Sequence, residues 1–162
     1  KKAVFSCTVK AVKEPIPAEM VKKMRDAEEF GLGANVMRQV FYTAYSFYLH
    51  HRDPTALVLD DYTDEIFRDY SPYPRFDGSY VYANFGHLIG YSAIYYTYQW
   101  SLAISKDLFT RFKSAGLQDP AVAKHYRESI LEPGGTQDAA DLVRAFLERE
   151  TTLDAYKKWL TE

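Results

Sequence analysis

The chain has 162 residues, a formal net charge of -2, a hydrophobic content of 47% and an aromatic content of 16%. This length can bury a substantial core within one domain, and the small charge gives no electrostatic basis for binding nucleic acid or an anionic membrane. The single Cys7 excludes an intrachain disulfide and is compatible with a reducing compartment. The apolar run after Lys1 and Lys2 is too short for a signal peptide, so we expect a cytoplasmic location.

The first predicted elements are a lead-in segment and a helix. Residues 1–14 include β-branched and aromatic positions and could form a strand or a frayed lead-in. Pro17 suits the first position of a helix, which we expect to continue to Phe30 and to end at Gly31. The apolar positions expected to be buried on this helix are Met20, Met24 and Ala27.

Two more helices are predicted before residue 71. The first, over residues 35–51, has a wide apolar surface and is expected to be enclosed on several sides. His50 and His51 at its end lie about 100° apart on a helix and do not suit one metal ion, so a solvated helix end is preferred. The second helix starts at residue 55 or 60 and ends at residue 70, and its acidic side chains form either a cation site or, as we expect, a solvated face. These side chains are Asp60, Asp61, Asp64 and Glu65.

An aromatic loop leads into an uncharged segment. Residues 71–86 combine prolines with aromatic residues, which indicates a packed loop beside a cleft. Residues 85–105 contain no charged side chain and are long enough to raise a transmembrane interpretation. Their His, Gln, Ser, Thr and four Tyr would face lipid poorly, so we prefer a buried helix.

Three tyrosines share one face if a helix starts at Tyr91. Tyr91, Tyr95 and Tyr98 follow the spacing i, i+4 and i+7, with His87 just before them, whereas Tyr96 points elsewhere and is expected in the core. A buried phenol needs a hydrogen-bond partner and a phenyl ring does not, so aligned hydroxyls indicate a polar cleft wall. A core helix whose tyrosines each bond a carbonyl explains the spacing equally well.

The rest of the chain is predicted to be helical. A helix over residues 119–131 contains His125 and Glu128, which suit a surface pair better than a metal site. A Pro-Gly-Gly break follows, then an amphipathic helix capped by Thr136 and a short helix over residues 152–160. The chain is therefore predicted to be all-α, an irregular multi-helix bundle.

Several stretches carry a family resemblance. The segment HLIGYSAIYYTYQWS, residues 87–101, resembles the H-L-x-G-G-Y-x-A-x-Y-Y-x-Y-x-W-S segment of zinc oligopeptidases related to thimet oligopeptidase, neurolysin, oligopeptidase A and bacterial peptidyl-dipeptidase. The other matching stretches are residues 126–136 and 146–149 and, more loosely, residues 14–17 and 37–41. The resemblance implies the fold of the C-terminal half of a zincin-type oligopeptidase catalytic domain. It covers residues 15–162 of a single helical domain over residues 1–162, with residues 1–14 as an atypical lead-in.

The resemblance also implies roles for five residues. His87 and Tyr98 would stabilise the transition-state oxyanion, and Tyr91 and Tyr95 would contact the substrate backbone. Gly90 would set how closely the backbone approaches the peptide. Relatives have two glycines where this sequence has Gly90 alone, and the missing residue could displace Tyr91 or His87.

The chain contains no H-E-x-x-H sequence. In the family, two His of this motif bind zinc, the Glu between them activates the bound water, and a later Glu completes the site. The resemblance therefore implies no cofactor in this chain, with zinc bound by a segment that would precede Lys1.

Two functions are compatible with these features. The chain is either the substrate-binding portion of a zinc metallopeptidase that cleaves short peptides and is inactive alone, or a non-catalytic truncated helical protein that self-associates or binds peptides. The expected partners are short peptides, the zinc-bearing segment or a second copy, and neither nucleic acid nor a membrane.

Overall fold

The computed structural model describes residues 17–161, which form helices joined by turns and contain no strand. The all-α prediction is confirmed, whereas the predictions for residues 1–14, including Cys7, lie outside the described part. The α-helices are α1 Ala18–Glu29, α2 Leu32–His51, α3 Leu59–Tyr70, α4 Val81–Asn84, α5 His87–Gly90, α6 Thr97–Ala115, α7 Pro120–Tyr126, α8 Ala139–Leu147 and α9 Asp154–Thr161. A π-helical turn, η1, spans Arg127–Leu131, and a 3-10 turn, η2, spans Gly134–Thr136.

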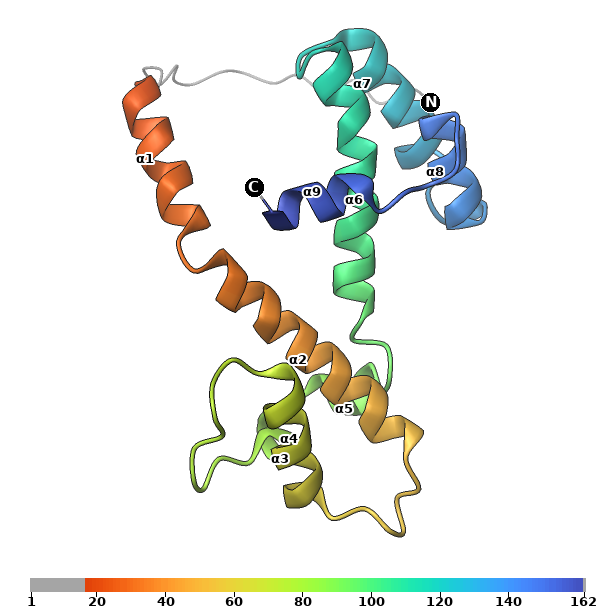
Figure 1. Ribbon diagram of the computed structural model, residues 1–162. Coiled ribbons are helices and arrows are strands. Elements are labelled where there is room, and N and C mark those ends of the chain that lie inside the picture. The colour runs from red at the N-terminus through yellow and green to blue at the C-terminus, as the bar shows by residue number, and fades with distance from the viewer. Residues whose placement is uncertain (1–16, 162) are drawn as a thin grey trace, which may run out of the picture.

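The first predicted helix forms, but its apolar face is not buried. No residue of α1 is buried in the part of the chain that the structure describes, and Met20 and Met24 are 54% and 47% exposed. Gly31, with φ 76°, turns the chain between α1 and α2. Figure 1 shows α1 extending beyond α2, away from α3, α4 and α5. The prediction of a buried stripe is wrong because periodicity identifies an apolar face but not its partner.

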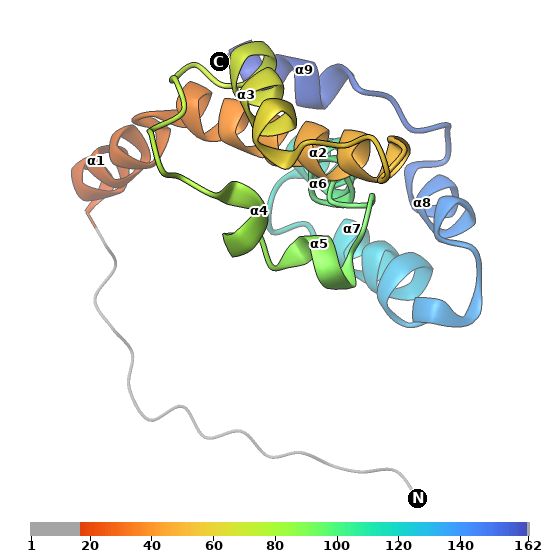
Figure 2. The same cartoon turned by 90° about the horizontal axis from the view of Figure 1, so that it is seen from below.

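The main core lies between α2 and α3, which are side by side in both views (Figures 1 and 2). The buried residues of this core are Phe41, Tyr45, Tyr62, Ile66, Phe85 and Tyr95. The opposite side of α2 is more open, since Met37, Phe47 and Tyr48 are all more than one-third exposed. The expected enclosure of α2 therefore holds for its α3-facing side only.

A second packing centre lies in the C-terminal half. α9 crosses α6, and α8 packs on α6 and η1 (Figure 1). Phe146 is fully buried, and its ring lies 5.9 Å from that of Phe112 and 5.3 Å from that of Tyr126. The aromatic contacts therefore connect α6, α7 and α8.

Several predicted boundaries differ from the structure. α2 begins at Leu32, and the aromatic loop before α5 contains α4. Asp138, not Thr136, caps α8, because its carboxylate accepts a hydrogen bond from Ala140 N at 2.8 Å. The Thr136 hydroxyl instead donates to the Pro133 carbonyl. Among the described helices, none has the length and apolar character that crossing a membrane requires.

Candidate functional site

The tyrosine segment does not form one helix from Tyr91. α5 ends at Gly90, residues 91–96 form turns, and α6 begins only at Thr97. Ser92 has φ 48°, a left-handed conformation that L-residues adopt at a cost, and its carbonyl accepts a hydrogen bond from Ser46 Oγ at 2.5 Å. The prediction of a helix from Tyr91 is wrong because this contact from α2 holds the segment in turns.

The turns nevertheless bring His87 and three tyrosines into one cluster of rings. The His87 ring centroid lies 5.5 Å from that of Tyr91, 5.0 Å from that of Tyr95 and 5.8 Å from that of Tyr98. The rings of Tyr95 and Tyr98 are 4.9 Å apart, and the Phe85 ring packs below Tyr95 at 5.1 Å. We call His87, Tyr91, Tyr95 and Tyr98 the His87 cluster.

The members of the His87 cluster differ in exposure. Tyr91 and Tyr98 are 44% and 43% exposed, and the Tyr98 hydroxyl lies 3.3 Å from His87 Nε2. The neighbouring phenol of Tyr91 raises the pKa of Tyr98, so Tyr98 is a neutral donor at pH 7. Tyr95 is buried, and its hydroxyl donates to Gln39 Oε1 at 3.1 Å. Burial raises the pKa of Tyr95.

Gly90 and Tyr96 are neighbours of the cluster in the sequence, and both are exposed. A Cβ built on Gly90 would meet no atom within 4 Å, so the backbone at the end of α5 is open to an approaching molecule. Tyr96 is 46% exposed and lies outside the core, which corrects its predicted burial. The segment before Thr97 forms turns instead of the expected helix, so the helical spacing that predicted burial of Tyr96 does not apply.

The chemistry available to the His87 cluster is hydrogen-bond donation to an exposed acceptor. A phenol donates one hydrogen bond, and a neutral imidazole donates from one of its two nitrogens. Because Tyr98 and His87 are adjacent and partly open, they can turn their donors toward the same oxygen of a bound molecule. Donors fixed in place before the reaction stabilise developing negative charge efficiently.

The described residues do not fit a metal ion. No group of three or more His, Cys, Asp or Glu in residues 17–161 could hold one. His50 Nδ1 lies 2.8 Å from the Ser46 carbonyl, and the ring of His51 stacks on Phe47, at an exposed helix end. Glu128 lies 3.8 Å from Lys124, and His125 Nδ1 contacts the Ser129 hydroxyl at 3.2 Å.

Three of the four acidic residues singled out on α3 pair with arginines. Asp60 and Asp64 lie 2.5 and 3.0 Å from the guanidinium of Arg75, whose side chain is only 14% exposed. Glu65 pairs with Arg52 at 2.5 Å. The expected solvated face is therefore largely neutralised by arginines, a pairing between distant residues that no local pattern indicates.

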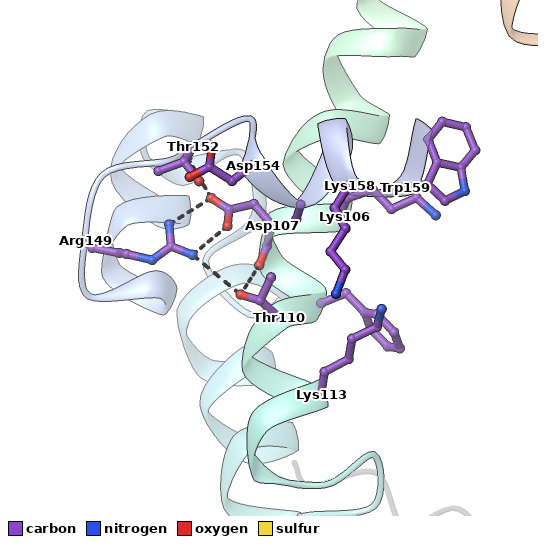
Figure 3. Close-up of a pocket in the computed structure, with 11 residues that line it drawn as sticks. Lys106, Asp107, Thr110, Lys113, Arg149, Thr152, Asp154, Lys158 and Trp159 are labelled. Carbon is purple, nitrogen blue, oxygen red and sulfur yellow. Dashed lines mark hydrogen bonds and ion pairs between the residues drawn. The ribbon is translucent and has the colours of Figure 1, made fainter. Parts of the chain in front are cut away.

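A buried carboxylate in the C-terminal half was not predicted. Asp107 of α6 is 1% exposed, and its two oxygens accept hydrogen bonds from Arg149 at 2.5 and 2.9 Å and from Thr152 N at 2.8 Å (Figure 3). Arg149 and Thr152 lower the pKa of Asp107. The available signal is a lone acidic residue four positions after the buried Ala103, on the same face of α6.

A cavity of about 550 Å³ borders this ion pair and is also lined by Lys106, Lys113 and Trp159 (Figure 3). The ammonium of Lys106 lies 4.4 Å from the centre of the Trp159 ring. Four basic and two acidic side chains line the cavity, so its lining is predominantly basic.

Gln39 is a second residue that the sequence did not identify. Its amide oxygen accepts the hydrogen bond from Tyr95 and so holds one member of the His87 cluster against α2. Gln99 makes a similar contact in the C-terminal half, accepting from the Tyr156 hydroxyl at 2.8 Å. The only signal for Gln39 is its place next to Arg38 in a stretch with loose family resemblance.

Comparison with known proteins extends over almost the whole chain. The sequence model of peptidase family M3 matches residues 4–162. Oligopeptidase A of Escherichia coli is 30% identical over 148 residues, and that of Haemophilus influenzae is 29% identical over 147 residues. Mitochondrial intermediate peptidase of Homo sapiens is 27% identical over 146 residues. Each match covers 88% of this chain but only 20–22% of the relative, so the chain spans about a fifth of the length of the curated relatives it matches.

Proposed function

Because the chain belongs to peptidase family M3, we propose that it is the substrate-binding portion of a zinc oligopeptidase that cleaves short peptides. The observation that carries this proposal is the contact of 3.3 Å between Tyr98 OH and His87 Nε2 at a partly exposed surface. The rings of both residues pack within the His87 cluster, but their polar atoms meet at a partly exposed surface where a bound molecule can reach them.

We assign His87 and Tyr98 to stabilisation of the oxyanion. When a peptide carbonyl is attacked, its oxygen gains negative charge, and hydrogen-bond donors aimed at that oxygen lower the barrier. Removing one such donor typically costs about 2.7–4 kcal/mol.

Tyr91, Tyr95 and Gly90 are assigned to substrate binding. Tyr91 is exposed beside Tyr98, with ring centroids 6.1 Å apart, and can reach a peptide that lies over the pair. The ring of Tyr95 forms the floor under Tyr98 while its hydroxyl is held by Gln39. The open backbone at Gly90 leaves room for a peptide strand.

The zinc of the family would come from a segment other than this one, whose sequence carries no H-E-x-x-H motif. The chain's own residues therefore supply binding, orientation and hydrogen-bond donors. The proposed partners are short peptides and that zinc-bearing segment. The cytoplasmic location stays a prediction.

A chimera tests the catalytic assignment. The matched segment of Escherichia coli oligopeptidase A is replaced by this chain, and cleavage of a quenched fluorescent peptide is measured. We expect Tyr98→Phe and His87→Gln each to lower kcat by about 100–1000-fold with a smaller change in KM. Tyr96→Phe removes a neighbouring exposed phenol and is the matched control. Equal effects of Tyr96→Phe and Tyr98→Phe would contradict the assignment.

Self-association is the second candidate, and the exposed face of α1 favours it. Exposed apolar faces are typical of interaction sites, and α1 presents Met20 and Met24, followed directly by the 89% exposed Phe30. Sedimentation over a range of concentrations tests this candidate. A monomer at high concentration would rule out self-association, whereas a dimer lost in Met20→Gln/Met24→Gln would support it.

A further inference from the structure

The arginines of this chain are nearly all paired with carboxylates. Among the residues that the structure describes, Arg25 and Arg38 are the two arginines without an ion-pair partner. The arginines with a carboxylate within 4 Å are Arg52, Arg68, Arg75, Arg111, Arg127, Arg144 and Arg149. An Arg guanidinium is always charged and presents several donors suited to a carboxylate.

Arg38 lies between two cavities. One, of about 450 Å³, is lined by side chains of α2, α6 and α9, and the other, of about 530 Å³, lies between α2 and the loop before α4. Asn35, Arg38 and Tyr42 line both cavities. The guanidinium sits 5.7 Å from the centre of the Tyr42 ring and 3.5 Å from its hydroxyl, so most of its donors stay available. Arg25 lines neither cavity.

The two cavities have different chemistry. The first contains Gln39 and Gln99 together with Tyr95 of the His87 cluster, so it offers amides of the kind that bond a peptide backbone. The second is mainly apolar, and its wall includes Phe41, Phe67 and the 80% exposed Phe76. A positive charge thus marks the boundary between an amide-lined cavity and an aromatic one.

We propose that Arg38 binds the C-terminal carboxylate of a short peptide whose last side chain is apolar and enters the aromatic cavity. The preceding backbone runs past Gln39 toward the His87 cluster. This inference rests on the proposed peptide-binding function and adds a charge anchor and a preference for the last residue.

The distances between rings give the number of residues that such a peptide needs. The steps from Arg38 to Tyr42, from Tyr42 to Tyr95 and from Tyr95 to His87 measure 5.7, 5.7 and 5.0 Å between centres. An extended peptide rises about 3.3 Å per residue, so about five residues are enough to reach from Arg38 to His87. A pentapeptide is therefore long enough to contact both Arg38 and the His87 cluster.

Binding to the full 162-residue chain tests the proposal. The probe is a pentapeptide that ends in Phe, carries an N-terminal fluorophore and is made either with a free carboxylate or as the C-terminal amide. Fluorescence anisotropy is expected to show binding about 10–100-fold weaker for the amide, the usual effect of losing a charge-assisted hydrogen bond. Replacing the last Phe with Gly should weaken binding as well.

The variants separate charge from folding. Arg38→Gln should bind the free acid as weakly as the amide, Arg38→Lys should be intermediate, and Arg25→Gln should match the unchanged chain. Circular dichroism checks that each variant is folded. If the acid and the amide bind the unchanged chain equally, or if Arg38→Gln weakens both alike, the carboxylate anchor is overturned while peptide binding stands. If neither peptide binds, the proposed function fails and this inference fails with it.

Discussion

The tyrosines of the α2–α3 core and those of the His87 cluster use the same side chain for different purposes. Tyr45 and Tyr62 are 0% and 1% exposed. The Tyr62 hydroxyl donates to the Tyr45 carbonyl at 2.6 Å, and the Tyr45 hydroxyl lies 2.8 Å from Thr63 Oγ1. Both phenols therefore end on fixed acceptors of the protein, and burial raises the pKa of each.

In the His87 cluster, by contrast, Tyr91 and Tyr98 keep their hydroxyls at the surface. The contact of Tyr98 with His87 is long, and a bound molecule could replace it at little cost. Tyr95 is intermediate, since it is buried and bonds a protein side chain as Tyr45 does, but its ring packs against His87 and Tyr98. Exposure of the phenol, rather than spacing in the sequence, thus distinguishes Tyr91 and Tyr98 from the structural tyrosines.

The largest expected difference is the response to truncation. Tyr62→Ala should lower the free energy of unfolding by about 3–5 kcal/mol, because a large buried ring is lost and the Tyr45 carbonyl loses a donor. Tyr98→Ala should cost less than about 1 kcal/mol, because its ring is 43% exposed. Urea denaturation measures both, and equal losses would remove the distinction between core and site.

Asp107 tests whether a buried polar group of the C-terminal half contributes to the stability of the fold as the core phenols do. Asp107→Asn should cost about 1.5–3 kcal/mol at pH 7, because Arg149 and Thr152 lose a charged acceptor. The carboxyl has a pKa below its ordinary value in the folded protein, so its contribution is present above about pH 4 and is lost as the pH falls further.

Urea denaturation between pH 7 and pH 3 measures this effect. The unchanged chain should lose more stability over that range than Asp107→Asn does. Asp141→Asn, which removes an exposed partner of Arg144, is the control and should cost less than about 0.5 kcal/mol. A loss of stability with falling pH that is equally steep in Asp107→Asn would show that other carboxyls cause it.

A smaller effect is expected when only a hydroxyl is removed. Tyr45→Phe keeps the buried ring but loses the bond to Thr63, so it should cost about 1 kcal/mol. Tyr98→Phe should leave the free energy of unfolding within about 0.5 kcal/mol, because the hydroxyl is at the surface. Thermal and urea unfolding of the two variants measure these losses. A larger loss of stability in Tyr98→Phe than in Tyr45→Phe would contradict the comparison.

The helical fold was predictable because its signals are local. Pro17, Gly31 and Asp119 mark helix ends that the structure places within a residue or two of the prediction. The exposed face of α1 was not predictable, since an apolar stripe does not specify a partner. The pairings of Arg75 with Asp60 and of Arg149 with Asp107 join distant residues and are equally invisible to local patterns.

The candidate site was predicted in composition but not in backbone path. The residues His87, Tyr91, Tyr95 and Tyr98 do lie together, although the helix expected to align them begins only at Thr97. The reason is a hydrogen bond from Ser46, 46 positions away in the chain, to the Ser92 carbonyl. A periodicity argument within one segment cannot include such a contact.

The smallest expected effect concerns the strained residue of this turn. Ser92 and Glu148 are the two non-glycine residues with positive φ among those described, at 48° and 58°. Ser92→Gly should raise the free energy of unfolding by about 0.5–1 kcal/mol, because glycine avoids the left-handed strain but loses more backbone entropy on folding. The hydrogen bond from Ser46 is retained, since it involves the backbone carbonyl.

Peptide binding should respond in the opposite direction. A glycine between Tyr91 and Tyr95 loosens the turn, and the entropy needed to order it on binding should weaken pentapeptide affinity by about two- to fivefold. Glu148→Gly makes the same backbone change at the end of α8, away from the His87 cluster, and removes an exposed ion pair with Arg111. It should leave peptide affinity unchanged. Anisotropy titrations of both variants measure this, and equal affinity changes would mean that the turn at Ser92 does not position the cluster.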